Sequence, residues 1–191
     1  DASAQALDMA LQRQVIQEAA ASPQAAIAGA NIVLLALPVS AAYALAAKLA
    51  PYLQPGQIVT DVSSVKGPVV SAWDQACPDG VAFVGGHPMA GSEKAGVEHA
   101  RPGLFAGANY FLTPSRRSSP SALATMTELA LAAGATPICL SPTEHDALVA
   151  FTSHLPHLCA ATLVNTAAAA TNNYAAYAAG GFADRSEEHT S

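Results

Sequence analysis

The feature that most constrains the fold is a regular alternation between short apolar runs and longer Ala-rich stretches. The apolar runs occupy residues 31–38, 57–64, 81–86, 108–114 and 136–142. Short apolar runs bounded by Pro, Gly or polar residues are typical of buried strands. The run that ends at Pro38 is apolar throughout, which predicts a parallel strand buried on both faces. The alternation therefore predicts an α/β fold with a doubly wound, mostly parallel sheet and helices on both of its faces.

Helical periodicity fills the stretches between these runs. Leu7, Leu11 and Val15 recur every fourth residue, as one face of a helix does. Ser40 stands where an N-cap is expected for a helix over 41–53. These signals predict one helix near the start of the sequence and another directly after the first strand.

The pattern changes after Thr143, beyond which only helical signals remain. We therefore expect one α/β domain over 1–144 and the start of an all-helical domain over 145–184. The polar, Ala-free segment 185–191 departs abruptly from this pattern, and we interpret it as a non-native tail, with an ordinary solvated terminus as the alternative.

Composition excludes several functional classes. Hydrophobic residues make up 51% of the sequence and charged residues 12%, which indicates a globular protein. A net charge of −6 provides no basic surface for nucleic acid, and no apolar run approaches the roughly 20 residues that span a bilayer. Cys77, Cys139 and Cys159 lack disulfide or CxxC spacing, and the sequence begins without a signal-type segment. We therefore expect a cytoplasmic protein that binds neither nucleic acid nor membranes.

Polar side chains follow three of the predicted strands. They lie in segments 35–40, 61–67 and 85–114. Because the carboxyl ends of parallel strands meet at one edge of a sheet, side chains from these segments are expected to gather there. The candidates are Ser64, Lys66, His87, Ser92 and Lys94. The two lysines either offset the charge of an anionic ligand or are solvated surface groups.

Three histidines raise the question of a metal site. His145, His154 and His157 follow an H-x8-H-x2-H spacing, which is not a zincin pattern, and no nearby acidic or cysteine set completes a catalytic site. We therefore expect no metal in this protein.

Three motifs together make the sequence similar to a known family. They are DVSSVKG (61–67), GGHPMAGSEKAGVEHARPGLFAGANYFLTP (85–114) and EHDALVAFTSHLPH (144–157). In content, order and spacing they resemble the prephenate and arogenate dehydrogenase family over about residues 31–182. The resemblance implies oxidative decarboxylation of prephenate or arogenate to 4-hydroxyphenylpyruvate or tyrosine, with hydride transfer to NAD or NADP. It also implies an intertwined homodimer formed by the helical domain.

The resemblance assigns catalytic roles to two residues. His87 matches the catalytic histidine, whose neutral imidazole is suited to accept the hydroxyl proton of the substrate. Ser64 matches a serine that hydrogen-bonds near that histidine and near the nicotinamide or substrate. The structural alternatives are a loop histidine bonded to backbone and an N-cap for a helix that begins at Val65. Gly85 and Gly86 are expected to let the backbone pass close to a ligand.

The resemblance also implies substrate contacts. Ser92 stands where the family carries a Thr or Ser that touches the substrate. His157 and His145 are expected to face the active-site cleft from the helical domain, with His157 nearer to a substrate carboxylate. His154 is expected to pack or to cap near a break at Leu155-Pro156.

The cofactor is expected to contact Leu37, Pro38 and Ser64. Asp1 either binds the adenosine ribose or caps the following helix, and no Arg follows it, which favours NAD over NADP. No GxGxxG motif occurs, so the first strand of a Rossmann-like fold and its phosphate-binding turn are expected upstream of residue 1. The family also has an arginine shortly after GGF-x-D, and Arg185 falls too early to match it. With both ends truncated in this way, the chain by itself is expected to be inactive.

Two rival interpretations remain at this stage. A related dehydrogenase of the β-hydroxyacid type would carry a catalytic Lys or Asn in the first helix of the second domain, where this sequence has SHLPH (153–157). A non-catalytic binding module would keep the fold without turnover, although His87 and Ser64 are both present.

Overall fold

The computed structural model describes residues 3–91, 96–171 and 182 of the chain. The chain divides into two compact units, Asp1–His145 and Asp146–Ser191, which are considered separately.

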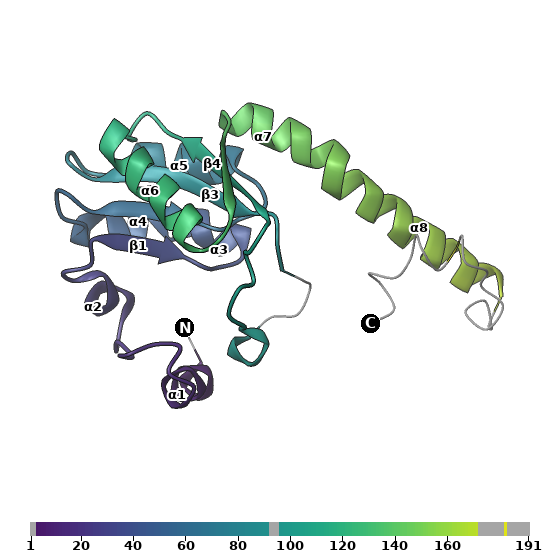
Figure 1. The fold of residues 1–191 in the computed structure, drawn as a ribbon, viewed down its shortest axis with the longest axis horizontal. Coiled ribbons are helices and arrows are strands. Elements are labelled where there is room, and N and C mark those ends of the chain that lie inside the picture. Colours follow the sequence, from purple (N-terminus) through teal and green to yellow (C-terminus); the bar gives the residue numbers. More distant parts are fainter. Residues whose placement is uncertain (1–2, 92–95, 172–181, 183–191) are drawn as a thin grey trace. The chain divides into compact units, whose positions relative to one another are not determined.

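The first unit is built on a five-stranded sheet whose strands follow one another in chain order (Figure 1). They are β1 (Ile32–Leu35), β2 (Ile58–Asp61), β3 (Ala82–Pro88), β4 (Asn109–Pro114) and β5 (Thr136–Cys139). Neighbouring strands pair in parallel except β3 and β4, which are antiparallel. The predicted α/β class with a mostly parallel sheet is confirmed.

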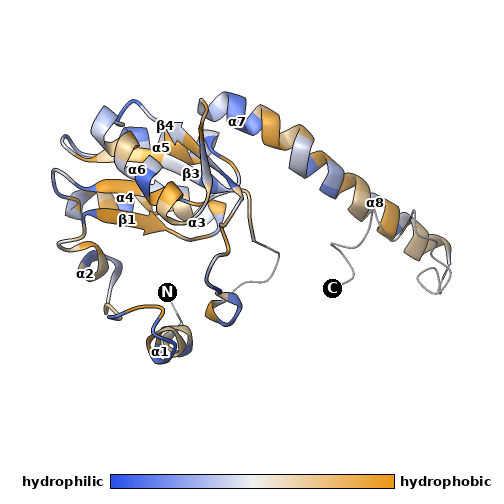
Figure 2. Cartoon of the chain, in the orientation of Figure 1, coloured by the Kyte–Doolittle hydropathy of each residue, from blue (hydrophilic) through white to orange (hydrophobic). Residues whose placement is uncertain are grey.

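Helices cover both faces of this sheet. One face carries α3 (Val39–Ala44), α4 (Ala46–Leu49), the short 3-10 turn η1 (Ala50–Tyr52) and α5 (Gly67–Ala76). The opposite face carries α6 (Pro120–Ala132), which packs on β3, β4 and β5. Figure 2 shows that β1 is strongly apolar. On the α5 side, Trp73 is fully buried and stacks on Phe83 with ring centroids 5.6 Å apart.

Two short helices precede the sheet. They are α1 (Ala4–Gln12) and α2 (Pro23–Ile27), whose N-termini are capped by the Ser3 and Ser22 hydroxyls. The predicted periodicity through Val15 overshoots, because the helix ends at Gln12 and Gln14 adopts a positive φ of 57°. Val15 is consequently half exposed.

Two predictions around the first strand are wrong. β1 is not buried on both faces, because Leu34 is 51% exposed. Ser40 is not a helix cap, because the helix starts two residues earlier than predicted, at Val39, with Pro38 as its N-cap. The single helix predicted over 41–53 is also divided into α3, α4 and η1.

The second unit continues a helix that begins in the first. α7 (Pro142–Val149) passes through a π-helical turn, η3 (Ala150–His154), into α8 (Leu155–Ala170). The break predicted at Leu155-Pro156 is absent. A proline ring inside an α-helix collides with the carbonyl four residues earlier, and the wider π turn just before Pro156 relieves that conflict.

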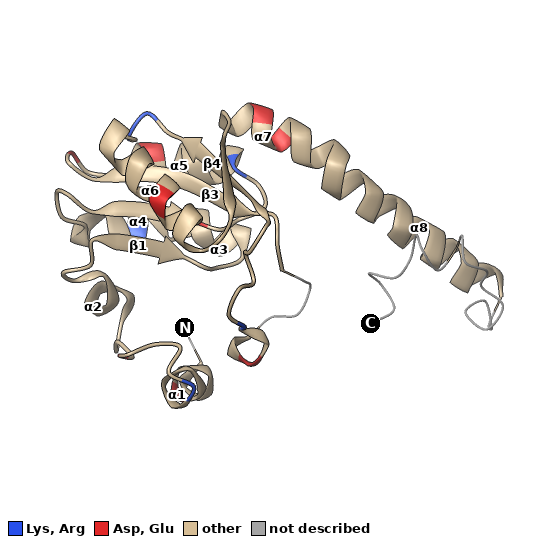
Figure 3. Ribbon diagram, in the orientation of Figure 1, with Lys and Arg blue, Asp and Glu red and all other residues tan. Residues whose placement is uncertain are grey.

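This helical stretch is more apolar than the sequence patterns indicated. Pro142–Ala170 is long enough and apolar enough to cross a membrane by length and composition, contrary to our expectation that no such run exists. α8 carries no Asp, Glu, Lys or Arg (Figure 3). Its exposed apolar side chains include Leu155, Leu158 and Leu163, and Phe151 in the preceding turn is 73% exposed. Such a surface is typical of a helix that is covered by a partner.

Candidate active site

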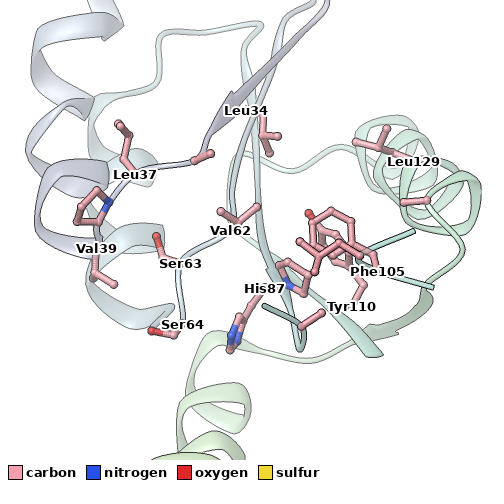
Figure 4. A pocket seen from close by; sticks show the side chains of 16 residues that line it. Leu34, Leu37, Val39, Val62, Ser63, Ser64, His87, Phe105, Tyr110 and Leu129 are labelled. Carbon is pink, nitrogen blue, oxygen red and sulfur yellow. The ribbon is translucent and has the colours of Figure 1, made fainter. Parts of the chain in front are cut away.

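A cleft of about 640 Å³ opens at the carboxyl ends of β1, β2 and β3. These three strands run parallel, so the segments that leave them converge at one edge of the sheet. Figure 4 shows Ser63 and Ser64 on one side of the cleft and Phe105 with Leu129 on the other. The lining is mostly apolar and comprises Leu34, Ala36, Leu37, Pro38, Val39, Val62, Ser63, Ser64, His87, Pro88, Ala90, Leu104, Phe105, Tyr110, Leu129 and Ala133. Its volume and apolar character suit a small organic ligand or cofactor.

His87 lines this cleft from the end of β3, where it pairs with Phe111 of β4. It lies inside the strand and not in the predicted loop, because β3 extends to Pro88. Only 9% of the residue is exposed. Its Nδ1 lies 2.8 Å from Nε2 of His145, a hydrogen-bonding distance. The strand and this contact together fix the orientation of the imidazole.

His145 reaches His87 from the first turns of α7 and is completely buried. A reciprocal capping box fixes the start of this helix: Glu144 accepts hydrogen bonds from the Ser141 N–H and hydroxyl, and the Glu144 N–H donates to the Ser141 hydroxyl. The bond from the Ser141 hydroxyl is the main reason why the pKa of Glu144 lies below its usual value. His145 does not line the cleft within this unit.

A buried ion pair lies beneath the strand that carries His87. Lys66 Nζ is 2.6 Å from Asp61 Oδ2 and 2.5 Å from the carbonyl oxygen of Gly86, and both charged side chains are fully buried. Asp61 also accepts hydrogen bonds from the backbone N–H groups of Ser63 and Gly86. Lys66 is therefore neither a solvated surface group nor a group facing an anionic ligand. It joins the loop after β2 to the end of β3.

The two glycines before His87 serve protein packing. A Cβ on Gly86 would lie 2.5 Å from the Asp61 carbonyl oxygen and 3.0 Å from the Tyr110 hydroxyl, and one on Gly85 would collide with Thr113. The expected close approach is thus to neighbouring strands and not to a ligand. Burial, together with the charge of Asp61, raises the pKa of Tyr110 to about 12, so its hydroxyl is neutral beside this backbone.

Two consecutive serines follow β2 and differ in environment. Ser64 is exposed and lines the cleft, and its predicted contact with cofactor or substrate stays a prediction. It is not a helix cap, because α5 begins at Gly67 after Lys66. Ser63 is buried, lines the same cleft, and its hydroxyl has no hydrogen-bond partner among the described residues. We did not single out Ser63 from the sequence; the only available signal was its place beside Ser64.

Other predicted site residues either lie outside the described residues or belong to the second unit. Asp1, Ser92 and Lys94 lie outside the described residues. His157 is exposed on α8 and belongs to the second unit. Leu37 and Pro38 line the cleft beside Ser64. No group of three or more potential metal-binding side chains occurs within residues 3–91, 96–171 and 182.

The amino-acid sequence matches two protein-family models, which together cover most of the chain. Residues 1–139 match the family model for the nucleotide-binding domain of prephenate dehydrogenase, and residues 141–187 match the model for its dimerization domain. The chain belongs to the prephenate dehydrogenase family. The resemblance seen in the three sequence motifs is therefore confirmed.

Individual proteins with similar sequences support the same family assignment. The chain is 38% identical over 179 residues to the prephenate dehydrogenase of Bacillus subtilis, covering 92% of this chain and 48% of the relative. It is 34% identical over 141 residues to the cyclohexadienyl dehydrogenase of Zymomonas mobilis, covering 74% of this chain and 48% of that protein. The chain thus spans about half the length of these relatives.

Solved structures share the fold. Prephenate dehydrogenase from Aquifex aeolicus, in complex with hydroxyphenyl propionate and NAD+, matches with a TM-score of 0.88 and 31% identity, covering 98% of this chain and 66% of that one. Synechocystis arogenate dehydrogenase matches with a TM-score of 0.82 and 31% identity over 100% of this chain and 69% of that one. A pyrroline-5-carboxylate reductase from Coxiella burnetii, at a TM-score of 0.58 and 15% identity, shares the fold alone.

Proposed function

We propose that this chain carries the base and the cofactor-facing wall of an NAD-dependent dehydrogenase that decarboxylates prephenate or arogenate oxidatively. The observation that supports this most strongly is His87, which is held rigidly at the wall of an apolar cleft over the carboxyl ends of three parallel strands. Proteins similar to this chain include a prephenate dehydrogenase and an arogenate dehydrogenase, which supports both prephenate and arogenate as candidate substrates.

The cleft fits a nicotinamide cofactor. Doubly wound sheets bind dinucleotides beyond the carboxyl ends of their strands, and this cleft lies there with a largely apolar lining suited to a flat ring. Leu37, Pro38 and Ser64 would hold the cofactor, which when bound supplies the hydride acceptor. NAD is favoured over NADP because Asp1 is followed by Ala2 and Ser3 and not by an Arg that would bind a 2′-phosphate.

His87 acts on the hydroxyl proton of the substrate. The substrate carbon that bears the hydroxyl loses its hydride while the ring carboxylate leaves as CO2, and the hydroxyl must give up its proton. A neutral imidazole within hydrogen-bond reach accepts that proton. Nδ1 of His87 is engaged by His145, so proton exchange with substrate takes place at Nε2.

The remaining substrate contacts are proposals that rest on the family motifs. Ser92 and His157 keep their proposed roles, with His157 directed to a substrate carboxylate. The complete burial of His145 favours a place behind His87 over the direct substrate contact that the motif implied.

The helical segment is proposed to form a homodimer. Residues 141–187 match a dimerization domain, and the uncharged helix α8 exposes Leu158 and Leu163, which a second copy would cover. Sedimentation of the purified chain at several concentrations tests this, and a monomer at every concentration would refute it. A small-molecule substrate, and not nucleic acid, is the other proposed partner, and a cytoplasmic location is proposed from the biosynthetic relatives.

The activity is tested in a chimera in which this chain replaces the matched part of the Bacillus subtilis prephenate dehydrogenase. NADH or NADPH formation is followed with each substrate, prephenate or arogenate, and each cofactor, NAD or NADP. We expect turnover with at least one of the two substrates and a higher kcat/KM for NAD than for NADP. A folded chimera that is inactive with both substrates would refute the proposed function, and a preference for NADP would refute the cofactor assignment.

A further inference from the structure

The contact between His87 and His145 joins two imidazoles through one proton. Only one of the two nitrogens, 2.8 Å apart, carries a hydrogen when both rings are neutral. If His145 donates, the proton of His87 sits on Nε2, and that nitrogen cannot accept another. If His87 donates from Nδ1, its Nε2 carries a lone pair. The direction of this hydrogen bond therefore decides whether His87 is a base.

We propose that His145 is a positioning residue, which accepts a hydrogen bond from Nδ1–H of His87 and so holds His87 in the tautomer whose Nε2 accepts a proton. The catalytic effect of this hydrogen bond rests on the proposed function. The tautomer of His87 does not, because it can be measured on the chain without substrate. The role resembles that of the carboxylate in a Ser-His-Asp triad, with a neutral ring in place of the charge.

The imidazole rings of His87 and His145 both pack against the ring of Phe111. The Phe111 ring packs edge-on against His145 with centroids 5.3 Å apart and lies 6.3 Å from the His87 ring. The His145 ring itself is set by α7, whose first turn is fixed by the capping box of Ser141 and Glu144. Phe111 and His87 are paired residues of adjacent strands, which fixes the relative positions of their Cα atoms.

Several ionisable groups on the neighbouring elements have partners of their own among the described residues. On β2 and at the start of α5, Asp61 and Lys66 neutralise each other. On β4, the raised pKa of Tyr110, about 12, keeps that hydroxyl protonated near neutral pH. On α7, Glu144 is bonded to Ser141, and Asp146 follows His145 directly in sequence.

The hydrogen bond between the two rings also matters when His87 takes up a proton. A neutral His145 remains an acceptor when His87 takes up a proton at Nε2, and the shared bond then stabilises the imidazolium.

The tautomer is measured on the 15N-labelled chain by long-range 1H–15N correlation of the histidine rings. The variants are His145→Phe, which removes the acceptor, and His145→Gln, whose amide oxygen can replace it. His99→Gln, on an exposed surface, is the control. We expect His87 to carry its proton on Nδ1 in the wild type, the control and His145→Gln, and mainly on Nε2 in His145→Phe. A wild-type His87 protonated on Nε2, or a His145→Phe variant that keeps the Nδ1 proton, would overturn the proposal.

Turnover in the chimera gives the catalytic readout. His145→Phe should lower kcat by at least about 10-fold, and at most by the roughly 10⁴-fold that follows loss of the orienting Asp in a Ser-His-Asp triad, with little change in KM for NAD. His145→Gln should recover most of that loss. If the parent chimera is inactive, the proposed function fails, whereas the tautomer measurement still decides the role of His145. If His145→Phe does not fold, the wild-type tautomer and the His145→Gln variant still decide it.

Discussion

Replacement of Lys66 by Met is the perturbation whose cost is best defined by the structure. The substitution keeps much of the apolar side-chain volume but removes the charge that lies 2.6 Å from Asp61. It leaves a fully buried carboxylate with two backbone N–H donors among the described residues, and it removes the donor to the Gly86 carbonyl. Breaking one side of a buried ion pair costs about 3–5 kcal/mol, a large part of the roughly 5–15 kcal/mol that stabilises a typical domain.

Urea unfolding followed by fluorescence measures this cost directly. Trp73, the only tryptophan in the chain, is buried and stacked on Phe83, so its emission reports unfolding of this sheet. With a typical slope of about 2 kcal/mol per M, Lys66→Met should lower the urea midpoint by about 2 M. The matched control is Lys48→Met on the exposed face of α4, which should change stability by less than about 0.5 kcal/mol.

A double variant separates the charge from the packing. Asp61→Asn combined with Lys66→Met leaves no unpaired buried charge, so it should be clearly more stable than Lys66→Met alone. A Lys66→Met variant within about 1 kcal/mol of the wild type, or a double variant no better than the single one, would refute the reasoning that this pair fastens the loop after β2 to β3.

Two further predictions concern the dependence of stability on pH. In the folded protein the pKa of Tyr110 is raised to about 12. The stability that its neutral hydroxyl contributes should therefore be fully present below pH 10 and be lost as the pH rises through 12. In urea titrations, the free energy of unfolding of a Tyr110→Phe variant should decline less steeply at alkaline pH than that of the wild type. Glu144 has a lowered folded pKa, so its contribution to the start of α7 is present above the usual glutamate pKa and lost as pH falls through the folded value. Thermal melts should show that Glu144→Ala is destabilised relative to wild type at pH 7 and that the difference shrinks below about pH 4; an equal difference at both pH values would contradict this.

The sheet was predictable because its signals are local. Each strand is a short apolar run, and a parallel sheet needs no more than such runs separated by helical stretches. The ends of elements were less predictable, because they depend on contacts with distant residues. β3 extends through His87 because the partner strand continues opposite it as far as Tyr110, a fact that no local pattern contains.

Part of the residue set that lines the cleft was predictable from motifs, but the contacts of these residues were not. His87 and Ser64 were found through their motifs, and both line the cleft. Lys66 was placed at the site as a possible surface group, yet its partner Asp61 stands five residues away and the bond to Gly86 spans 20 residues. The contact between His87 and His145 spans 58 residues and depends on how α7 is capped, so sequence spacing alone could not define it.

The most direct test of the central claim is the kcat of the chimera with His87→Asn. Asparagine preserves a polar side chain of similar reach but cannot accept and hold a proton in the neutral range. We expect kcat to fall by about 10²–10⁴-fold, the range for loss of a general base, while NAD affinity measured by calorimetry is little changed. Near-wild-type turnover of prephenate or arogenate by a folded His87→Asn chimera would contradict the account.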